Sequence, residues 1–492
     1  MNISWKNLGS RVLATAISAL AVAEQAAAQY AELNPASFAC APRNGAGRVS
    51  RGRDLVKIPV DLVAFPGSKC NDGSGAVFYV RRAPGDAALN KWHIHLQGGG
   101  ACSDAQTCAN RWCSDETNFG ANKMSSQGTP SAIRAGGIFS RRAFNAFAQW
   151  NHVFIYYCSS DSWSGQQLDK MLDAEEPTCN EGGACGAVEY LAHFRGASIV
   201  DAVRDQLRQD CGAAACPPQD YSYIDADTDA PVAMPDLDDA TVVLLSGSSA
   251  GSAGVRRLAD ELGGVLDINN NNGVGSLDFR AVSDAGIGAD IESANFDIPC
   301  DQAGFCTCAG APCTYDEYMS AFDVNVRDGL RDARAEASCE LWHAAGGDTW
   351  RCADDTHIAL HHLTTPFFVR QDMEDELLME NFRTSAFGTC DDYGASIEAR
   401  LNALFTDPLD ATAEEGRGMN PLNPMLTVPG VFGPQNGDHE TLQHKAFFRV
   451  RLPDPAGMPF SFHDLLSNWV NGAGPTQLVA PFVANGPPSY CP

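Results

Sequence analysis

Three runs of continuously apolar residues constrain the fold of this chain more than any other feature of its sequence. They are HVFIYY (152–157), ATVVLLSG (240–247) and PFFVRQD (366–372). Strands that are apolar at successive positions are buried on both faces, as in a parallel sheet covered by helices. Other β-forming runs lie at 76–82, 91–96 and 279–285.

The intervals between these runs are long enough for the crossover connections that parallel strands require. We expect helices in two of the intervals, at 187–208 and 252–262. The pattern predicts an α/β fold with a mostly parallel central sheet and helices on both faces. Stretches rich in Cys, Pro, Gly and Asp are expected to be loop insertions stapled by disulfides, at about 160–190, 209–240, 286–345 and 376–425.

The N-terminus has the features of a secretory signal peptide. Lys6 and Arg11 precede an apolar run at 12–23 that is too short to span a bilayer, and an A-x-A pattern ends at Ala28. We therefore expect residues 1–28 to be a signal peptide and the protein to be secreted or periplasmic. No later apolar run is long enough for a membrane span.

The cysteines agree with export. All 18 lie between Cys40 and Cys491, and an even number in an exported chain indicates disulfides, up to nine here. Their pairing cannot be read from the sequence. The cysteines at 300–313 lack the paired C-x-x-C spacing of a zinc site, so we expect disulfides there as well.

The formal net charge of −27 limits the classes of partner. A strongly acidic surface repels nucleic acid and anionic membranes. We therefore expect no nucleic-acid partner, and we interpret the charge as an adaptation for solubility or salt.

Two acidic stretches resemble calcium loops but depart from the pattern. In the run at 225–229 the turn glycine is replaced by Ala230, and in the span at 267–278 it is replaced by Asn272. We expect both to be solvated loops.

The motif G-x-S-x-G occurs where it has a chemical meaning. An apolar strand ends in GSSAG (247–251), and a helix-forming segment follows. In this strand–turn–helix context the glycines leave room for a sharp turn that exposes the central serine, here Ser249. Ser248 and Ser252 lack flanking glycines at the required positions. We predict that Ser249 is a nucleophile.

A serine nucleophile requires a base and a carboxylate that orients the base. In α/β-hydrolases the carboxylate follows a late strand and precedes the histidine. The segment after PFFVRQD offers Asp372, Glu374 and Asp375, and the residues alone do not decide among them.

Three histidines lie beyond that strand. His439 follows a glycine- and proline-containing loop and is favoured by its position. His444 is expected on a following helix, and His463 is expected to serve packing.

The other histidines have structural explanations. His93 and His95 alternate on one face of a strand. His357 and His361 have the i, i+4 spacing of a zinc pair but lack the glutamate of an H-E-x-x-H motif. We expect neither a metal ion nor an organic cofactor.

Three consecutive glycines follow the strand at 91–96, in LQGGGAC (96–102). Ester hydrolysis places negative charge on the carbonyl oxygen, which backbone N–H groups must stabilise. In this fold one donor is the residue after the nucleophile, here Ala250, and the other comes from a glycine-rich loop after the third strand. A phosphate-binding loop is excluded because the G-x-G-x-x-G and G-K-S/T patterns are missing.

Six ordered blocks resemble the pectin acetylesterase/Notum family of extracellular serine carboxylesterases. HLQGGGAC is similar to the family's HLEGGGWC, and YCSSDSWSG to its YCSSDxWSG. AHFRGASIVDAV, SGSSAGSAG, FRAVSDAGI and TPFFVRQDMED match further blocks in the same order, over about residues 75–445.

The resemblance implies an α/β-hydrolase catalytic domain over residues 29–492 and a Ser-Asp-His triad. The family's aspartate lies nine residues after the proline that opens its strand, which favours Asp375 over Asp372 here. The family's oxyanion loop maps onto Gly99 and Gly100. Ala101 stands where relatives carry an aromatic residue, and it is the candidate for a changed substrate pocket.

We therefore expect an ester substrate, with an acetyl or other acyl group on a carbohydrate or small molecule. Ser249, Asp375 and His439 would form the triad, and Gly99, Gly100 and Ala250 the oxyanion hole. The alternatives are a lipase-like enzyme for longer acyl or aromatic esters, a non-catalytic binding protein that kept the hydrolase fold, and a calcium-stabilised binding module.

Overall fold

The computed structural model describes only part of the chain. The described residues are 38, 51–114, 119–177, 186–208, 222–224, 231–289, 314–382, 390–406 and 429–484. The expected signal peptide, the cysteines at 300–313 and the acidic run at 225–229 lie outside them.

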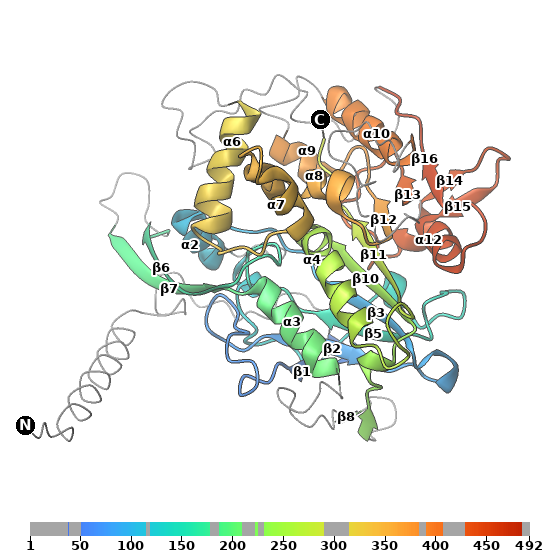
Figure 1. Cartoon of the computed structure of the whole chain (residues 1–492), viewed down its shortest axis with the longest axis horizontal. Helices are drawn as coiled ribbons and strands as arrows, with labels where there is room; N and C mark the ends of the chain where they lie inside the picture. The colour runs from blue at the N-terminus through green and yellow to red at the C-terminus, as the bar shows by residue number, and fades with distance from the viewer. Residues whose placement is uncertain are drawn as a thin grey trace, which may run out of the picture.

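A ten-stranded sheet forms the centre of the described structure, as Figure 1 shows. Its strands are β1 (Arg51–Pro59), β2 (Val77–Arg81), β3 (Lys91–Leu96), β4 (Ala132–Ile133), β5 (Asn151–Ile155), β10 (Val242–Ser248), β11 (Asp278–Asp284), β12 (Phe367–Arg370), β13 (Gly430–Gly433) and β16 (Gln477–Val479). Their order is β16-β13-β12-β11-β10-β3-β5-β2-β1-β4. The pairs from β16 to β5 are parallel, and those from β5 to β4 are antiparallel. The predicted, mostly parallel α/β sheet is confirmed.

Helices cover both faces of this sheet. On β11, Phe279 packs against α4 (Ala250–Ile268), because a Cβ added at Gly263 would lie 2.7 Å from the Phe279 ring. The next residue, Arg280, lies over the Trp469 ring of α12 (Phe462–Asn471), 5.0 Å from its centroid. Successive side chains of a strand point to opposite faces, so α4 and α12 lie on opposite sides.

The remaining helices surround this core. They are α2 (Ala105–Cys113), α3 (Gly196–Leu207), α6 (Tyr315–Phe322), α7 (Ala337–His343), α8 (Asp355–His357), α9 (Glu376–Phe382), α10 (Cys390–Thr406) and α11 (Ala446–Arg449). Short 3-10 helices are η2 (Asp86–Ala88), η3 (Ala121–Lys123), η4 (Gly137–Phe139), η5 (Leu237–Asp239) and η7 (Thr349–Ala353), and two π-helical turns are η6 (Asp323–Asp328) and η8 (Ile358–His362). None of the described helices combines the length and the hydropathy that crossing a membrane requires.

The helix expected at 187–208 is wrong over its first part. Ala187–Phe194 is strand β7, which pairs antiparallel with β6 (Gln167–Glu175). Tyr190, Ala192 and Phe194 are fully buried at every second position, which is the period of a strand. The helix α3 begins only at Gly196. Two further hairpins pair β8 (Ser222–Ile224) with β9 (Pro231–Ala233), and β14 (Arg451–Pro453) with β15 (Pro459–Ser461).

Disulfides staple the loops around the sheet. Among the described residues they join Cys70 to Cys158, Cys102 to Cys108 and Cys339 to Cys352. The predicted presence of disulfides is confirmed, but of these six cysteines only Cys339 lies within the insertions expected from the sequence.

Candidate active site

Ser249 occupies a strained turn between β10 and α4. Its backbone has φ 55° and ψ −122°, in the left-handed half of the map that non-glycine residues rarely adopt. A Cβ at Gly247 would lie 2.1 Å from the carbonyl oxygen of Gly251, and a Cβ at Gly251 would lie 2.0 Å from that of Leu96. Both motif glycines are therefore required for the turn and for its packing against the end of β3.

The glycine triplet follows β3 and lies beside Ser249. A Cβ at Gly98 would come within 3.0 Å of the Ser249 Cβ. Gly99 and Gly100 have φ of 147° and 63°, which glycine adopts without strain. Within the described part of the chain, the N–H groups of Gly99, Gly100 and Ala250 donate to no protein acceptor. These donors are therefore available to a ligand.

Two buried cationic side chains pack against the glycine loop. Arg111 Nη2 donates to the Gly99 carbonyl at 2.6 Å, and a Cβ at Gly99 would lie 2.8 Å from Lys123 Cδ. Burial lowers the pKa of Lys123 to about 7 and that of Arg111 to about 10. Neither residue belongs to a motif that sequence reasoning recognised, because only the fold brings them under the loop.

His439 and Asp375 lie in contact although 64 residues separate them. The His439 Nδ1 is 2.9 Å from Asp375 Oδ1 and 2.8 Å from Oδ2. Asp375 is fully buried, and its carboxylate also accepts from Gln371 Nε2 at 3.0 Å and from the Leu378 N–H at 3.1 Å. This arrangement fixes the His439 proton on Nδ1 and leaves Nε2 as an acceptor.

The structure does not join Ser249 to His439 directly. The Nε2 of His439 is buried and has no hydrogen-bond partner among the described residues. Such hydrogen bonds are often long without substrate and tighten in the complex. Gly98 lies between Ser249 and the residue that follows His439. A Cβ at Gly98 would come within 2.2 Å of Glu440 Oε1 as well as close to the Ser249 side chain.

Asp372 has a different partner. It forms a buried ion pair with Arg370, and burial raises its pKa to about 7 although the Arg370 charge lowers it. Arg370 in turn donates to the carbonyl of His439 at 2.9 Å and to that of Asp438 at 2.8 Å. Asp372 therefore supports the loop that carries His439 without contacting the imidazole.

Asp284, at the end of β11, was missed by sequence reasoning. Its buried carboxylate accepts from Ser248 Oγ at 2.8 Å, from the N–H groups of Thr441 and Leu442 at 3.0 and 2.8 Å, and from Arg370 at 3.2 Å. It therefore ties the nucleophile strand to the histidine loop. The residue lies in FRAVSDAGI, but nothing in that block indicates its partners.

The other two histidines of the late segment lie elsewhere. His463 is buried, and its Nε2 accepts from the Ala146 N–H at 3.1 Å, which agrees with a packing role. His444 lines a separate cavity beside Phe448.

The segment YCSSDSWSG (157–165 in the chain) braces the glycine loop. The buried Asp161 accepts from Ser159 Oγ at 2.6 Å and from the N–H groups of Trp163 at 2.9 Å and Gly196 at 2.7 Å. Trp163 then donates its indole N–H to the carbonyl of Gln97 at 2.9 Å, one residue before the triplet. This motif therefore positions the glycine loop.

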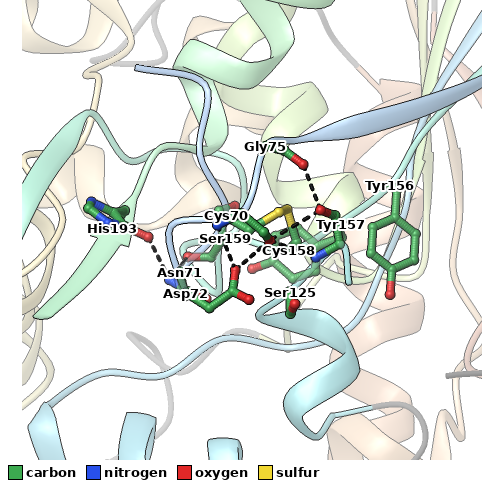
Figure 2. The surroundings of a disulfide bond; sticks show 12 residues. Cys70, Asn71, Asp72, Gly75, Ser125, Tyr156, Tyr157, Cys158, Ser159 and His193 are labelled. Carbon is green, nitrogen blue, oxygen red and sulfur yellow. Dashed lines mark hydrogen bonds between the residues drawn. A yellow bond between two sulfur atoms is a disulfide. The ribbon is translucent and has the colours of Figure 1, made fainter. Parts of the chain in front are cut away.

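The disulfide between Cys70 and Cys158 anchors the same segment, as Figure 2 shows. The neighbouring Asn71 donates through Nδ2 to the carbonyls of Ser159 at 2.8 Å and His193 at 2.7 Å. The disulfide therefore joins the connection before β2 to the loop after β5, and Asn71 links the same connection to the end of β7.

Removing this disulfide is expected to destabilise the fold. The two cysteines are 88 residues apart, so the chain-entropy contribution of the cross-link is about 4–5 kcal/mol. Replacing both by alanine should lower the free energy of unfolding by about that amount in a guanidinium titration. The Cys102–Cys108 bond closes six residues, and its removal should cost only about 2 kcal/mol. Equal losses would contradict the argument.

The charge state of His439 predicts a pH dependence. Burial alone would lower the pKa of His439, but the hydrogen bond and charge of Asp375, together with the Glu440 charge, raise it above its ordinary value of 6.5. A base must be neutral, so kcat/KM for an ester should increase with pH through a limb above 6.5. Asp375→Asn should move this limb to lower pH, and Glu440→Gln should move it less. An unshifted limb in Asp375→Asn would contradict the assignment.

A cavity of about 460 Å³ opens beside the glycine loop, and Ala101 lines it. Phe322 and Leu378 supply apolar walls, while Arg257 and Arg331 supply positive charge. Arg257 is paired with Asp355, whose Oδ1 lies 2.5 Å from its Nε. The cavity therefore offers both apolar and polar contacts beside Ala101, the residue that follows the glycine triplet.

The two end carboxylates of the acidic span at 267–278 contact groups of the protein itself. Asp267 accepts from the N–H groups of Gly275 and Leu277, and Asp278 pairs with Arg280 at 2.7 Å. Its two end carboxylates therefore close a turn and balance an arginine.

The chain is similar to known proteins over part or most of its length. The family model described as Pectinacetylesterase matches residues 54–214. Palmitoleoyl-protein carboxylesterase NOTUM of Schmidtea mediterranea is 28% identical over 327 residues, covering 65% of this chain and 49% of the relative. Pectin acetylesterase 11 of Arabidopsis thaliana is 29% identical over 141 residues, covering 29% of this chain and 30% of the relative.

The crystal structure of the Wnt deacylase Notum from Drosophila shares the fold. It superposes with a TM-score of 0.55 at 23% identity, over 85% of this chain and 93% of that one. The predicted α/β-hydrolase fold is thereby confirmed. The match to the Schmidtea mediterranea protein spans about half of that protein's length. The chain is therefore similar in sequence to the pectin acetylesterase/Notum family over part of its length.

Proposed function

We propose that this protein is a serine carboxylesterase that acts through an acyl-enzyme intermediate. Ser249 Oγ attacks the ester carbonyl while His439 Nε2 takes its proton, and the alcohol then leaves with that proton. Water, deprotonated by His439, breaks the Ser249 acyl bond and releases the acid. Asp375 stabilises the imidazolium in both steps.

The observation that carries this proposal is the strained conformation of Ser249 at the end of β10, next to free N–H donors and within the same loop cluster as His439. Non-glycine residues in such conformations persist only where the surroundings impose them, and they gather at active sites. The contact between Asp375 and His439 supplies an oriented base in the same cluster. No metal or organic cofactor is required for these steps.

Export to an oxidising compartment belongs to the proposal. Disulfides persist in secreted and periplasmic proteins and are rare in the cytosol. The bonds at Cys70, Cys102 and Cys339, together with the expected signal peptide, support a secreted or periplasmic location.

Covalent labelling tests the proposal. A fluorophosphonate should inactivate the oxidised protein with one adduct per chain, and peptide mapping should place it on Ser249. Labelling should be slower at a pH below the acid limb of the kcat/KM profile, because His439 is then protonated and cannot act as a base. Esterase activity without any adduct at Ser249 would overturn the proposal.

The relatives point to two classes of substrate, protein palmitoleoyl esters and pectin acetyl esters. Charged side chains on the wall of the cavity make a poor surface for a long alkyl chain, because burying a charge beside it is costly. We therefore favour a short acyl group on a polar alcohol such as a carbohydrate. With p-nitrophenyl esters of increasing length, kcat/KM should be highest at acetate. A maximum at six carbons or more would favour the lipase-like alternative.

Ala101→Trp should narrow the cavity next to the reacting carbonyl. Because Ala101 is exposed and lines the cavity, an indole there removes space without replacing a buried contact. We expect kcat/KM for a six-carbon ester to decrease about tenfold or more relative to acetate, about 1.4 kcal/mol of lost transition-state binding. Ala101→Ser is the matched control and should leave the ratio unchanged. Parallel losses on both esters would argue against a pocket at this position.

A further inference from the structure

Three buried histidines meet outside the proposed active site. His343 ends α7, while His357 ends α8 and His362 ends η8. Their ring centroids are separated by 5.1 to 5.5 Å, and each residue is at most 7% exposed. The His357 and His361 rings are in contact, with centroids 4.8 Å apart, but the nitrogens that converge with His357 are those of His343 and His362.

Their nitrogen atoms converge at distances suited to one ion. A ring nitrogen of each histidine and the Cys339 sulfur all lie within 4.8 Å of one another. The Nε2 atoms of His343 and His357 are 3.0 Å apart. Two nitrogens bound to tetrahedral Zn²⁺ at about 2.0–2.1 Å are separated by about 3.3 Å. Cys339 is in a disulfide with Cys352 and offers no thiolate, so the histidines are the ligands.

A neighbouring carboxylate orients His343 for metal binding. Its Nδ1 lies 3.1 Å from the Asp348 carboxylate, so the proton is held on Nδ1 and Nε2 carries a lone pair. A carboxylate that holds the second nitrogen of a histidine in this way is the usual partner of a metal ligand. The Nε2 of His362 is buried and has no hydrogen-bond partner among the described residues. An orphaned buried nitrogen is costly unless a ligand binds it.

We propose that His343, His357 and His362 bind a divalent transition-metal ion, Zn²⁺ in preference to others, and that Asp348 orients His343. Three neutral imidazoles suit Zn²⁺ and its neighbours in the first transition series, whereas Ca²⁺ and Mg²⁺ require oxygen ligands. The fourth position is left to water. The proposed ester hydrolysis does not use this ion, and either proposal can fail without the other.

The ion would stabilise the segment that lines the cavity beside Ala101. Arg257, from the helix after Ser249, donates to the carbonyls of Cys352 at 3.2 Å and Ala353 at 2.8 Å. Ala353 and Asp355 lie on the wall of the cavity. Joining α7 to η8 through one ion therefore holds this wall against α4.

Zinc binding is tested with the untagged, oxidised full-length chain after removal of metal by a chelator. We expect one Zn²⁺ per chain by calorimetry and a melting temperature raised by about 3 °C at a hundredfold excess over Kd. Co²⁺ should give the intense visible bands of a tetrahedral site. His357→Gln should abolish both, and Asp348→Asn should weaken binding about 10–100-fold.

His361→Gln is the matched control, because this residue lies on the same turn but its nitrogens lie outside the donor group. It should bind zinc like the parent chain. Equal melting temperatures with and without zinc, an octahedral cobalt spectrum, or unchanged binding in a variant with all three histidines replaced by glutamine would overturn the proposal. A cooperative thermal unfolding transition of each variant without metal, followed by far-UV circular dichroism, shows that it is folded.

Discussion

Replacing Ser249 by alanine is expected to lower kcat for p-nitrophenyl acetate about 10⁴–10⁶-fold, which is the range that follows loss of a serine nucleophile elsewhere. The methyl group cannot form the acyl bond, and only the N–H donors and substrate binding remain. The measurement is the steady-state kcat of the variant, compared with that of the parent chain under the same conditions. The variant should also lose labelling by a fluorophosphonate.

Ser252→Ala is the matched control for this loss. Ser252 lies one helical turn from Ser249, and its hydroxyl bonds with Ser283 and Arg256 inside the core. Its removal should cost stability while leaving kcat within about tenfold of the parent value, because it touches no reacting atom. Rapid turnover by the Ser249→Ala chain, or an equal loss in both variants, would remove Ser249 from its proposed role.

Much of the fold could be predicted from local patterns. The strands at β5, β10 and β12 are buried on both faces, and such strands show continuous apolar runs whatever their neighbours are. The turn at Ser249 could be predicted because Gly247 is needed locally, where a Cβ would clash with the carbonyl of Gly251 in the same motif. These features depend on a few adjacent residues.

Features that depend on the assembled fold could not be predicted. The local sequence does not reveal strand β7, because its apolar face, Tyr190 to Phe194, is buried by a distant cluster that includes Trp112 and Leu330. Asp284 gains its partners from the loop at 441–442, and Lys123 its burial from the glycine loop. The three histidines converge only because α7 and η8 fold together, which the i, i+4 spacing does not indicate.

The family resemblance favoured one of two carboxylates between which the local sequence pattern does not distinguish. Asp372 and Asp375 both follow the same strand, and the residues alone left the choice open. The structure brings Asp375 to the His439 Nδ1 and pairs Asp372 with Arg370. The catalytic roles of these residues stay a prediction, and the two carboxylates provide a direct comparison.

Asp375→Asn is expected to lower kcat about 10⁴-fold, because the amide keeps the shape of the site but favours the wrong imidazole tautomer and cannot stabilise the imidazolium. Asp372→Asn should cost no more than about tenfold. Its carboxylate contacts Arg370, which holds the histidine loop through the carbonyls of Asp438 and His439 and keeps its bond to Asp284.

The pH profile separates the two carboxylates further. Asp375→Asn removes the hydrogen bond and charge that raise the pKa of His439, so its acid limb should move to lower pH. Asp372→Asn should move the limb less, since its carboxylate pairs with Arg370 and does not contact the imidazole. If the larger loss and the shifted limb both belonged to Asp372→Asn, the orienting carboxylate would be Asp372, and the histidine loop would have to move on substrate binding to reach it.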